Sequence, residues 1–279
     1  MLELSVVVPA RNAERLLDDC LRSIVRSEPR EIIVVDGESS DRTVEIARRH
    51  GAKVLSDGGQ GLPAARLIGA RAALAPWVAL IDADVLLGEG DLARLLAEVR
   101  RDGYTALQAG LRSVSRDGYW GRALVQHHRT GRSKDWFGVV ATIFDRQALL
   151  HHGFDARFLS GEDIDLRWRL RKAGAKIGVS RDTVVEHRFD DTWEFAKGQW
   201  LADGHGFGRM VGAHGMPAKL LLAMPLAAGV RGVILSLLRG QPRWLRYYAC
   251  FVAFNYVGLV REVAGRGRAV RTRAAGERA

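Results

Sequence analysis

The chain has 279 residues and a formal net charge of +10, from 42 Lys and Arg against 32 Asp and Glu. Hydrophobic residues make up 47% and charged residues 27%, which excludes a disordered polar chain and a polytopic membrane protein. The two cysteines, Cys20 and Cys250, form no C-x-x-C motif, which disfavours a disulfide scaffold or a zinc ribbon. No secretory signal opens the chain, so a cytoplasmic location is expected.

The first half alternates short apolar runs with amphipathic stretches. The pattern predicts strands at 3–8, 31–35, 53–55 and 77–81 and helices at 13–25, 43–50 and 63–74. This alternation predicts an α/β fold with a doubly wound, mostly parallel sheet, whose ligands bind at the carboxyl ends of the strands. Polar clusters follow three of these strands, at 11–12, 36–41 and 82–84.

The second half is less regular. Strands are expected at 104–110 and 139–144, on either side of a Gly-, His- and Arg-rich stretch, and helices at 163–173 and 193–211. Beyond about residue 215 come two apolar blocks, 220–238 and 249–260, the first interrupted by Arg231. Neither block holds the ~18 uncharged residues of a confident transmembrane helix. We therefore expect a domain at 1–215 followed by a helical appendage at 216–279 that associates with a membrane or forms a dimer contact.

Asp82-Ala83-Asp84 directly follows a strand predicted to be buried. Two carboxylates at a strand exit can face one divalent cation, and Mg²⁺ or Mn²⁺ prefers oxygen ligands and bridges protein carboxylates to phosphates. The alternative is a simple turn, in which Asp is common.

Two further clusters contain titratable side chains. Gly161-Glu162-Asp163 opens a predicted helix, where a carboxylate is either a cap or a rigidly held general base. Glu186-His187 follows a β-rich stretch, and the imidazole is either structural or a metal ligand.

The segment Gly59-Gln60-Gly61 suggests a different function. Residues 59–64 fit the dinucleotide-binding pattern G-x-G-x-x-A before a helix, and Asp82 lies about 20 residues further on, where that motif has an acidic residue. That pattern is typical of NAD(P)-dependent oxidoreductases. However, Ser56-Asp57-Gly58 separates the strand from the glycines, and the motif would follow the third strand instead of the first. A Walker-type NTPase and a Ser hydrolase are disfavoured because their motifs are absent from the sequence.

Together these segments resemble family 2 glycosyltransferases with the GT-A fold. The resemblance rests on residues 6–12 (VVVPARN), 33–43 (IVVDGESSDRT), 82–84 (DAD, similar to the D-x-D metal motif), 153–155 (GFD) and 161–166 (GEDIDL, similar to the E-D motif). It covers roughly residues 4–190. The family implies a Rossmann-like catalytic domain and a metal-dependent, inverting transfer from a nucleotide-diphosphate sugar.

The resemblance also implies roles for residues. The donor nucleotide sugar would be bound by residues on the first two strands and beside the metal motif, namely Pro9, Ala10, Arg11, Asp36, Glu38, Arg66, Asp82 and Ala83. Asp84 and His187 would be direct ligands of Mg²⁺ or Mn²⁺, with Asp82 on the ribose or on metal-bound water. Asp163 would be the base and Glu162 would assist it. The acceptor side would be lined by Trp136, Phe137, Gly138 and Gly161.

The sequence departs from the family pattern twice. An Asp-Asp-Gly-Ser turn is here Asp36-Gly37-Glu38-Ser39, so base recognition is expected to differ in detail. An Ala-Arg-Asn-x-Gly segment is here 65–69 (ARLIG), which leaves Arg66 as the expected contact near the diphosphate.

The tail resembles that of family members acting on polyprenyl-linked acceptors. Residues 261–279 hold six arginines and two glutamates, so positive charge is concentrated there. We expect no nucleic-acid partner, peripheral attachment to the anionic inner face of the cell membrane, and a hydroxyl acceptor that is lipid-linked or belongs to the cell envelope. For the tail, the alternative to membrane attachment is a homodimer contact. For the chain as a whole, the alternative to catalysis is a non-catalytic glycan- or lipid-binding module on this fold.

Overall fold

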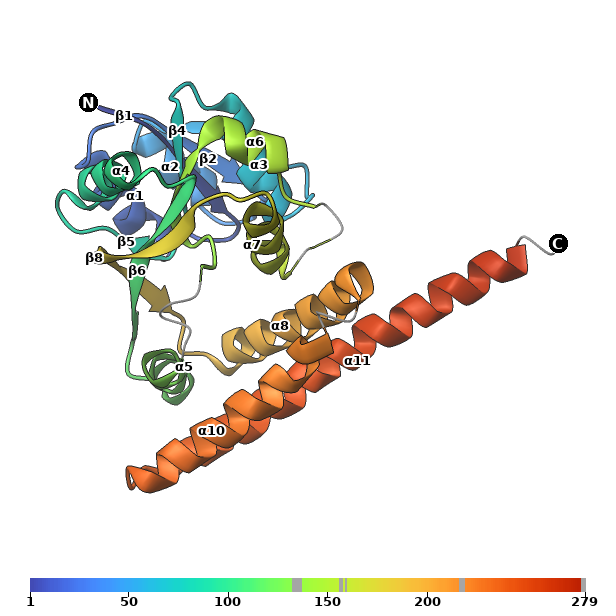
Figure 1. The fold of residues 1–279 in the computed structure, drawn as a ribbon. Helices are drawn as coiled ribbons and strands as arrows, with labels where there is room; N and C mark the ends of the chain where they lie inside the picture. The colour runs from blue at the N-terminus through green and yellow to red at the C-terminus, as the bar shows by residue number, and fades with distance from the viewer. Residues whose placement is uncertain (132–136, 156–157, 159, 216–218, 277–279) are drawn as a thin grey trace. The chain divides into compact units, whose positions relative to one another are not determined.

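The computed structural model describes residues 1–131, 137–155, 158, 160–215 and 219–276. The chain divides into two compact units, coloured along the sequence in Figure 1. The first unit comprises Met1–Val114 and Arg132–Phe189, and the second comprises Ser115–Gly131 and Asp190–Ala279.

The first unit is built on one eight-stranded sheet flanked by helices. Its elements are β1 (Leu2–Ala10), α1 (Leu17–Val25), β2 (Pro29–Asp36), α2 (Thr43–Arg49), β3 (Lys53–Ser56), α3 (Leu62–Ala72), β4 (Trp77–Ile81), β5 (Val85–Leu86), α4 (Asp91–Asp102), β6 (Ala106–Ser115), β7 (Ala141–Asp145), α6 (Arg146–His152), α7 (Glu162–Lys172) and β8 (Ile177–Phe189).

The strand order is β3-β2-β1-β4-β7-β6-β8-β5. The four strands β3, β2, β1 and β4 pair in parallel, as the alternation of strand and helix predicts. Pairing becomes antiparallel from β7 onward, where the regular alternation in the sequence also stops. The α/β architecture with a mostly parallel first half, expected from the sequence, is confirmed.

Successive residues of the central strands pack on opposite faces of the sheet. Val6 and Val8 join one hydrophobic core with α1, α2 and α4, whereas Val7 joins a second core with α3, α6 and α7. This alternation is the signature of a sheet buried on both faces. The layers are therefore helix, sheet and helix.

Helix α3 lies unusually close to β1. A Cβ added at Gly69 would lie 2.2 Å from Val7 Cγ1, so only glycine permits this approach. Arg66 is one turn earlier on α3 and shares that face, since residues three apart lie on the same side of a helix. The close contact brings the Arg66 guanidinium over the carboxyl ends of the strands.

Several elements differ from the sequence-based expectation. The helix expected at 13–25 begins only at Leu17; before it, Ala13 and Glu14 donate their backbone N–H groups to Thr43 and Asp41. Helices α4 and α6 were not expected at all. In α4 the apolar residues Leu92, Leu95, Leu96 and Val99 recur with helical spacing.

The second unit is helical. It contains α5 (Tyr119–Thr130), α8 (Trp193–His214), the 3₁₀ turns η2 (Leu220–Ala223) and η3 (Pro242–Trp244), α10 (Met224–Leu238) and α11 (Leu245–Gly276). Helices α5 and α8 thus belong to the same compact unit as the C-terminal helices, whereas the sequence-based division falls near residue 215. Helix α5 was not expected, because it lies in the stretch that the sequence analysis left irregular.

Glycines set the contacts of α11. A Cβ at Gly204 of α8 would lie 2.0 Å from the Asn255 carbonyl oxygen, and a Cβ at Gly232 of α10 would lie 2.0 Å from the Tyr248 ring. Small residues at such crossings let helix backbones approach closely. The unit is therefore held by backbone-close packing of α8 and α10 on α11.

His127 of α5 is half-buried and packs in an aromatic cluster against α11. Its ring lies 4.8 Å from Phe251 and 5.7 Å from both Tyr247 and Tyr248, centroid to centroid. Burial, together with the charge of Arg231, lowers the pKa of His127 to about 4. The imidazole is therefore neutral in the folded unit at pH 7.

We predict an acid-sensitive stability of this unit. The unfolded chain protonates His127 near pH 6.5, above the folded pKa, so the stabilisation is fully present above about 6.5 and is lost as the pH falls toward 4. Wild type should lose about 2 kcal/mol between pH 7 and pH 5 through this group. Thermal unfolding followed by circular dichroism at both pH values measures it. Between pH 7 and pH 5, the variant His127→Gln should lose less unfolding free energy than wild type does. The exposed control His151→Gln should lose as much as wild type. The same pH dependence in all three proteins would contradict the prediction.

Candidate functional site

The strand ends of the parallel half place several polar residues on one edge of the sheet. In the register, Ala10 lies opposite Asp36, and Asp36 lies opposite Ser56. Asp82 directly follows β4, which is the other neighbour of β1. The connections run to opposite sides of the sheet between β1 and β4, and ligands of doubly wound sheets bind at this switch point.

Asp36 has a buried carboxylate with one unused oxygen. Its Oδ2 accepts the N–H of Ser39 at 3.1 Å, while Oδ1 has no hydrogen-bond partner among the residues that the structure describes. Glu38 has φ of +60° and its carboxylate accepts the hydroxyl of Ser56. Arg11 is exposed and packs along Gly37. The sequence-predicted residues of β1 and β2 are thus brought together, with Asp36 Oδ1 available as an acceptor.

Asp82 and Asp84 lie in a tight turn. The Asp82 N–H donates to the Val140 carbonyl at 2.9 Å, and the Val85 N–H returns to the Asp82 carbonyl at 3.0 Å. Beneath the turn, the Cys20 thiol lies 3.7 Å from the same carbonyl. Burial and the charge of Asp84 raise the pKa of this thiol, so Cys20 is an uncharged packing residue and not a nucleophile.

His187 reaches Asp84 through a strand pairing that spans much of the chain. The two-residue β5 pairs antiparallel with β8, which sets Val85 opposite His187, and the Arg188 N–H donates to the Asp84 carbonyl at 3.0 Å. His187 Nε2 then lies 3.2 Å from Asp84 Oδ2. Burial alone would lower the pKa of His187, but the neighbouring carboxylate of Asp84 outweighs it and raises that pKa.

The pair Asp84 and His187 fits a divalent cation. Asp84 Oδ1 is buried and has no hydrogen-bond partner among the described residues. Within the same residues, no three His, Cys, Asp or Glu side chains gather as a ready metal shell. One carboxylate and one imidazole leave most positions of a six-coordinate Mg²⁺ or Mn²⁺ for phosphate oxygens and water, which is how these ions are commonly held at diphosphates.

Asp82 makes a different contact. Arg66 Nη2 lies 2.9 Å from Asp82 Oδ1 and 3.2 Å from Oδ2, and Arg66 Nη1 lies 2.9 Å from Glu162 Oε1. The Arg66 side chain is 2% exposed. Burial disfavours its charge, but Asp82 and Glu162 outweigh that effect and raise the pKa of the guanidinium. Arg66 therefore links the turn after β4 to the start of α7.

Helix α7 begins at Glu162, with Asp163 next to it. Gly161 precedes the helix with φ of +79°, a conformation that favours glycine, so this residue shapes the helix entry. Glu162 is buried on Arg66, whereas Asp163 is only half-buried. The positive end of the helix dipole stabilises carboxylates here. Of the two acids, Asp163 is therefore the more exposed.

The residues expected on the acceptor side differ in where the structure places them. Trp136 lies outside the described residues. Phe137 is in the hydrophobic core with its ring 6.1 Å from Phe144, so it packs beneath the surface. The Gly138 N–H donates to Gln108 Oε1 at 2.8 Å. Val139 follows with φ of +62°, a strained conformation for a β-branched residue.

Asp57 was missed by sequence reasoning. Its buried carboxylate accepts the N–H groups of Gly59 at 2.7 Å and Gly61 at 3.0 Å. The amides that a dinucleotide pyrophosphate would need are thus used within the loop, which speaks against the oxidoreductase reading. An Asp two residues before a glycine is a turn signal in its own right.

The chain is similar to known proteins in sequence and in fold. Residues 5–156 match glycosyl transferase family 2. An uncharacterized glycosyltransferase of Mycobacterium tuberculosis (strain ATCC 25618 / H37Rv) is 40% identical over 95 residues, which cover 34% of this chain and 43% of that protein. The match thus spans less than half the length of this curated relative.

Two solved structures share the fold. A mannosyltransferase from Pyrobaculum calidifontis, in complex with GDP-Man and Mn²⁺, has a TM-score of 0.63 at 19% identity and covers 92% of this chain and 87% of its own. Glucosyl-3-phosphoglycerate synthase from Mycobacterium tuberculosis, with Mn²⁺, UDP-Glc and phosphoglyceric acid, has a TM-score of 0.52 at 18% identity and covers 75% of this chain and 78% of its own. With the family match over more than half of its length, the chain belongs to glycosyl transferase family 2.

Proposed function

We propose that the chain catalyses a metal-dependent, inverting transfer of a sugar from a UDP- or GDP-sugar to an acceptor hydroxyl. The observation that supports the proposal most is the Arg66 bridge, because it ties the turn that carries Asp84 to the start of the helix that carries the half-buried Asp163. The two solved structures named above were determined with Mn²⁺ and a nucleotide sugar, which supports the donor class and the cation.

The donor's nucleoside would lie at the ends of β1 and β2. Asp36 Oδ1 would accept a hydrogen bond from the base or ribose, since a buried carboxylate oxygen without a partner is costly. Pro9, Ala10, Arg11 and Glu38 would line this part. Asp82, held by Arg66, and Ala83 would lie beside the ribose and the diphosphate. A role for Asp82 as a metal ligand as well stays a prediction.

Asp84 and His187 would hold Mg²⁺ or Mn²⁺. When bound, this cation neutralises negative charge on the leaving nucleoside diphosphate. Because the leaving group is a good one and inversion is a single displacement, no covalent nucleophile on the protein is required.

Asp163 would act as the general base. Its carboxylate would take the proton of the acceptor hydroxyl while the hydroxyl oxygen forms a bond to the anomeric carbon and the bond from that carbon to the phosphate oxygen breaks. The electron pair of that bond leaves with the diphosphate. Glu162 would assist by orienting α7 through Arg66, because its own oxygen is already engaged there. Gly161 and Gly138 would border the acceptor.

The acceptor, the location and the division into domains are further parts of the proposal. The basic, apolar C-terminal region supports an acceptor linked to a polyprenyl lipid or to an envelope glycan, reached from the inner face of the cell membrane. Residues 1–215 would perform the transfer and 216–279 would associate with the membrane or a second copy. A non-catalytic glycan-binding module is the second candidate, since the fold alone does not imply catalysis.

We predict that Asp163→Asn lowers kcat by about 10²–10⁴-fold, because the amide cannot accept the hydroxyl proton. The rate is measured as the release of nucleoside diphosphate when the protein is given an acceptor and each of a panel of nucleotide sugars. The exposed carboxylate variant Asp182→Asn should match wild type. A rate for Asp163→Asn within a factor of two of wild type would show that another group is the base, and no turnover of any donor by wild type would favour the non-catalytic module.

Metal binding gives a second prediction. Mn²⁺ together with UDP or GDP should raise the thermal unfolding midpoint of wild type, and EDTA should abolish the increase. Asp84→Ala and His187→Gln should each remove the Mn²⁺-dependent part of the shift, because each deletes one of two protein ligands. An unchanged Mn²⁺ response in both variants would place the cation elsewhere.

Removing Arg66 should damage both stability and rate. Arg66→Met leaves the buried Glu162 and the half-buried Asp82 without their cation, which costs about 3–5 kcal/mol of unfolding free energy. Arg66→Lys keeps the positive charge but cannot reproduce the planar guanidinium that donates to Asp82 and Glu162 at once. This variant should therefore fold, and its kcat should fall by a larger factor than its nucleotide affinity. Urea unfolding, nucleotide titration and steady-state kinetics separate these effects. The control is Arg71→Met on the exposed side of α3; equal stability of the two Met variants would contradict the assigned role of Arg66.

A further inference from the structure

Helix α10 presents an unpartnered apolar face within the helical unit. Leu226, Val230, Ile234 and Leu237 follow one another at intervals of four, four and three residues, which aligns them along one side of the helix. We call these four residues the α10 stripe. Their exposed fractions are 52%, 49%, 50% and 56%, values that are high for aliphatic residues on consecutive helical turns. Such a continuous exposed surface marks an interaction site.

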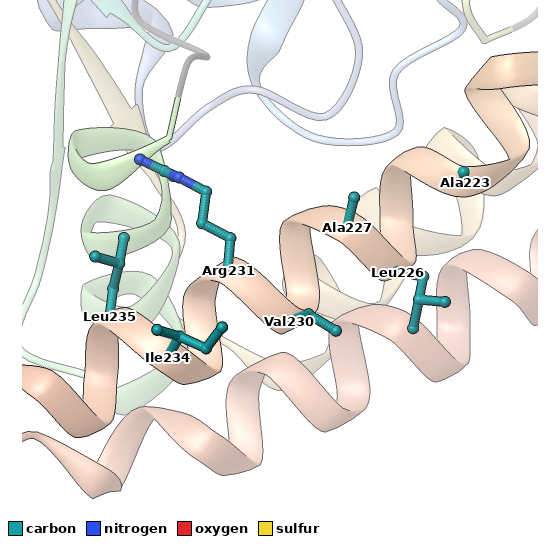
Figure 2. Close-up of a pocket in the computed structure, with 7 residues that line it drawn as sticks. All are labelled: Ala223, Leu226, Ala227, Val230, Arg231, Ile234 and Leu235. Carbon is teal, nitrogen blue, oxygen red and sulfur yellow. The ribbon is translucent and has the colours of Figure 1, made fainter.

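A shallow apolar groove runs along this helix. It is lined by Ala223, Leu226, Ala227, Val230, Arg231, Ile234 and Leu235 (Figure 2). Arg231 contributes the only charged side chain of this lining. In Figure 2 that side chain extends away from the helix toward α5, and its charge lowers the pKa of His127 on α5. The stripe itself is therefore uninterrupted by charge.

The opposite side of α10 is already used. Gly229 and Gly232 are buried, and a Cβ on either would lie within 2.3 Å of a side chain of α11. The stripe residues are exposed where these glycines are buried, so the stripe lies outside the contact with α11.

The charged residues in the sequence around the α10 stripe are all basic. Between residues 204 and 261 the sequence has no Asp or Glu and seven Lys or Arg. Lys219 is exposed before the stripe, and Arg239 and Arg243 are exposed after it. Cations thus flank both ends of the apolar surface.

We propose that the α10 stripe docks into the surface of an anionic phospholipid bilayer, with α10 lying in the plane of the interface. The aliphatic side chains enter the boundary between headgroups and acyl chains, and Lys219, Arg239 and Arg243 contact lipid phosphates. This inference rests on the membrane association proposed above for residues 216–279 and names the surface and the lipid class that bring it about; it holds whichever sugar is transferred.

A second copy of the chain fits this face less well. Two stripes packed antiparallel would bring the Lys219 end of one copy to the Arg239 and Arg243 end of the other. With no acidic side chain in this part of the sequence, the like charges would have no counter-ions on the partner.

A spanning helix also fits less well. Among the described residues, one helix is long and apolar enough to cross a membrane by length and composition, Leu220–Leu238, with 19 residues and a mean hydropathy of 2.0. Arg231 lies in its middle part, where a charge is costly in hydrocarbon. An in-plane helix needs only one apolar face and leaves Arg231 at its edge.

The test is co-sedimentation of the full chain with vesicles. Wild type should bind vesicles of phosphatidylcholine with phosphatidylglycerol at least tenfold more tightly than vesicles of phosphatidylcholine alone. Val230→Glu/Ile234→Glu should lose this binding at least tenfold. The matched control is Val25→Glu, a 43% exposed aliphatic position on α1, which should bind as wild type does. Circular dichroism and nucleotide-induced thermal shifts show whether each variant is folded.

Three outcomes would overturn the proposal. Equal vesicle binding by the folded double variant and wild type would remove the stripe from the interface. Wild type that resists alkaline carbonate extraction would be a spanning protein. Absent vesicle binding, with a dimer in solution that the double variant dissociates, would assign the stripe to a second copy. Loss of sugar transfer with intact vesicle binding would count against the proposed function and not against this inference.

Discussion

The buried guanidinium of Arg66 is the contact on which the site depends. Removing a charge from water costs several kcal/mol, and that cost is offset here only because Asp82 and Glu162 both lie 2.9 Å from it. The three side chains come from α3, the turn after β4 and the start of α7. One ion-pair cluster therefore fixes the relative positions of the turn that carries Asp84 and the helix that carries Asp163.

Two glycines allow the segments that carry Arg66, Asp82 and Glu162 to come together. Gly69 lets α3 rest on β1 at a distance no other residue allows, and Gly161 turns the chain into α7 with a positive φ. The short pairing of β5 with β8 then adds His187 beside Asp84. The candidate site is in this way built from separate segments joined by polar contacts, while the hydrophobic cores hold the layers.

In the helical unit, packing dominates instead. Glycines of α8 and α10 bring these helices against α11, and His127 is kept neutral among aromatic rings. The α10 stripe is an apolar surface that this packing leaves exposed. The buried Gly229 and Gly232 make the contact with α11, and the larger aliphatic residues of the stripe lie outside it. The apolar composition of 220–238 is thus divided between an internal contact and an external surface.

Local pattern in the sequence determined the parallel half of the fold, since β1, β2, β3 and β4 are short apolar runs between amphipathic helices, and it placed Asp36, Asp82, Asp84 and Asp163 at strand or helix ends. The tertiary structure decided which of these side chains meet. The Asp84–His187 contact joins residues 103 apart, and the Arg66–Glu162 contact joins residues 96 apart. Neither leaves a local signal, because periodicity reports only neighbours within a few residues. The burial of Phe137 and the split of 220–238 into two faces likewise depend on what packs against them.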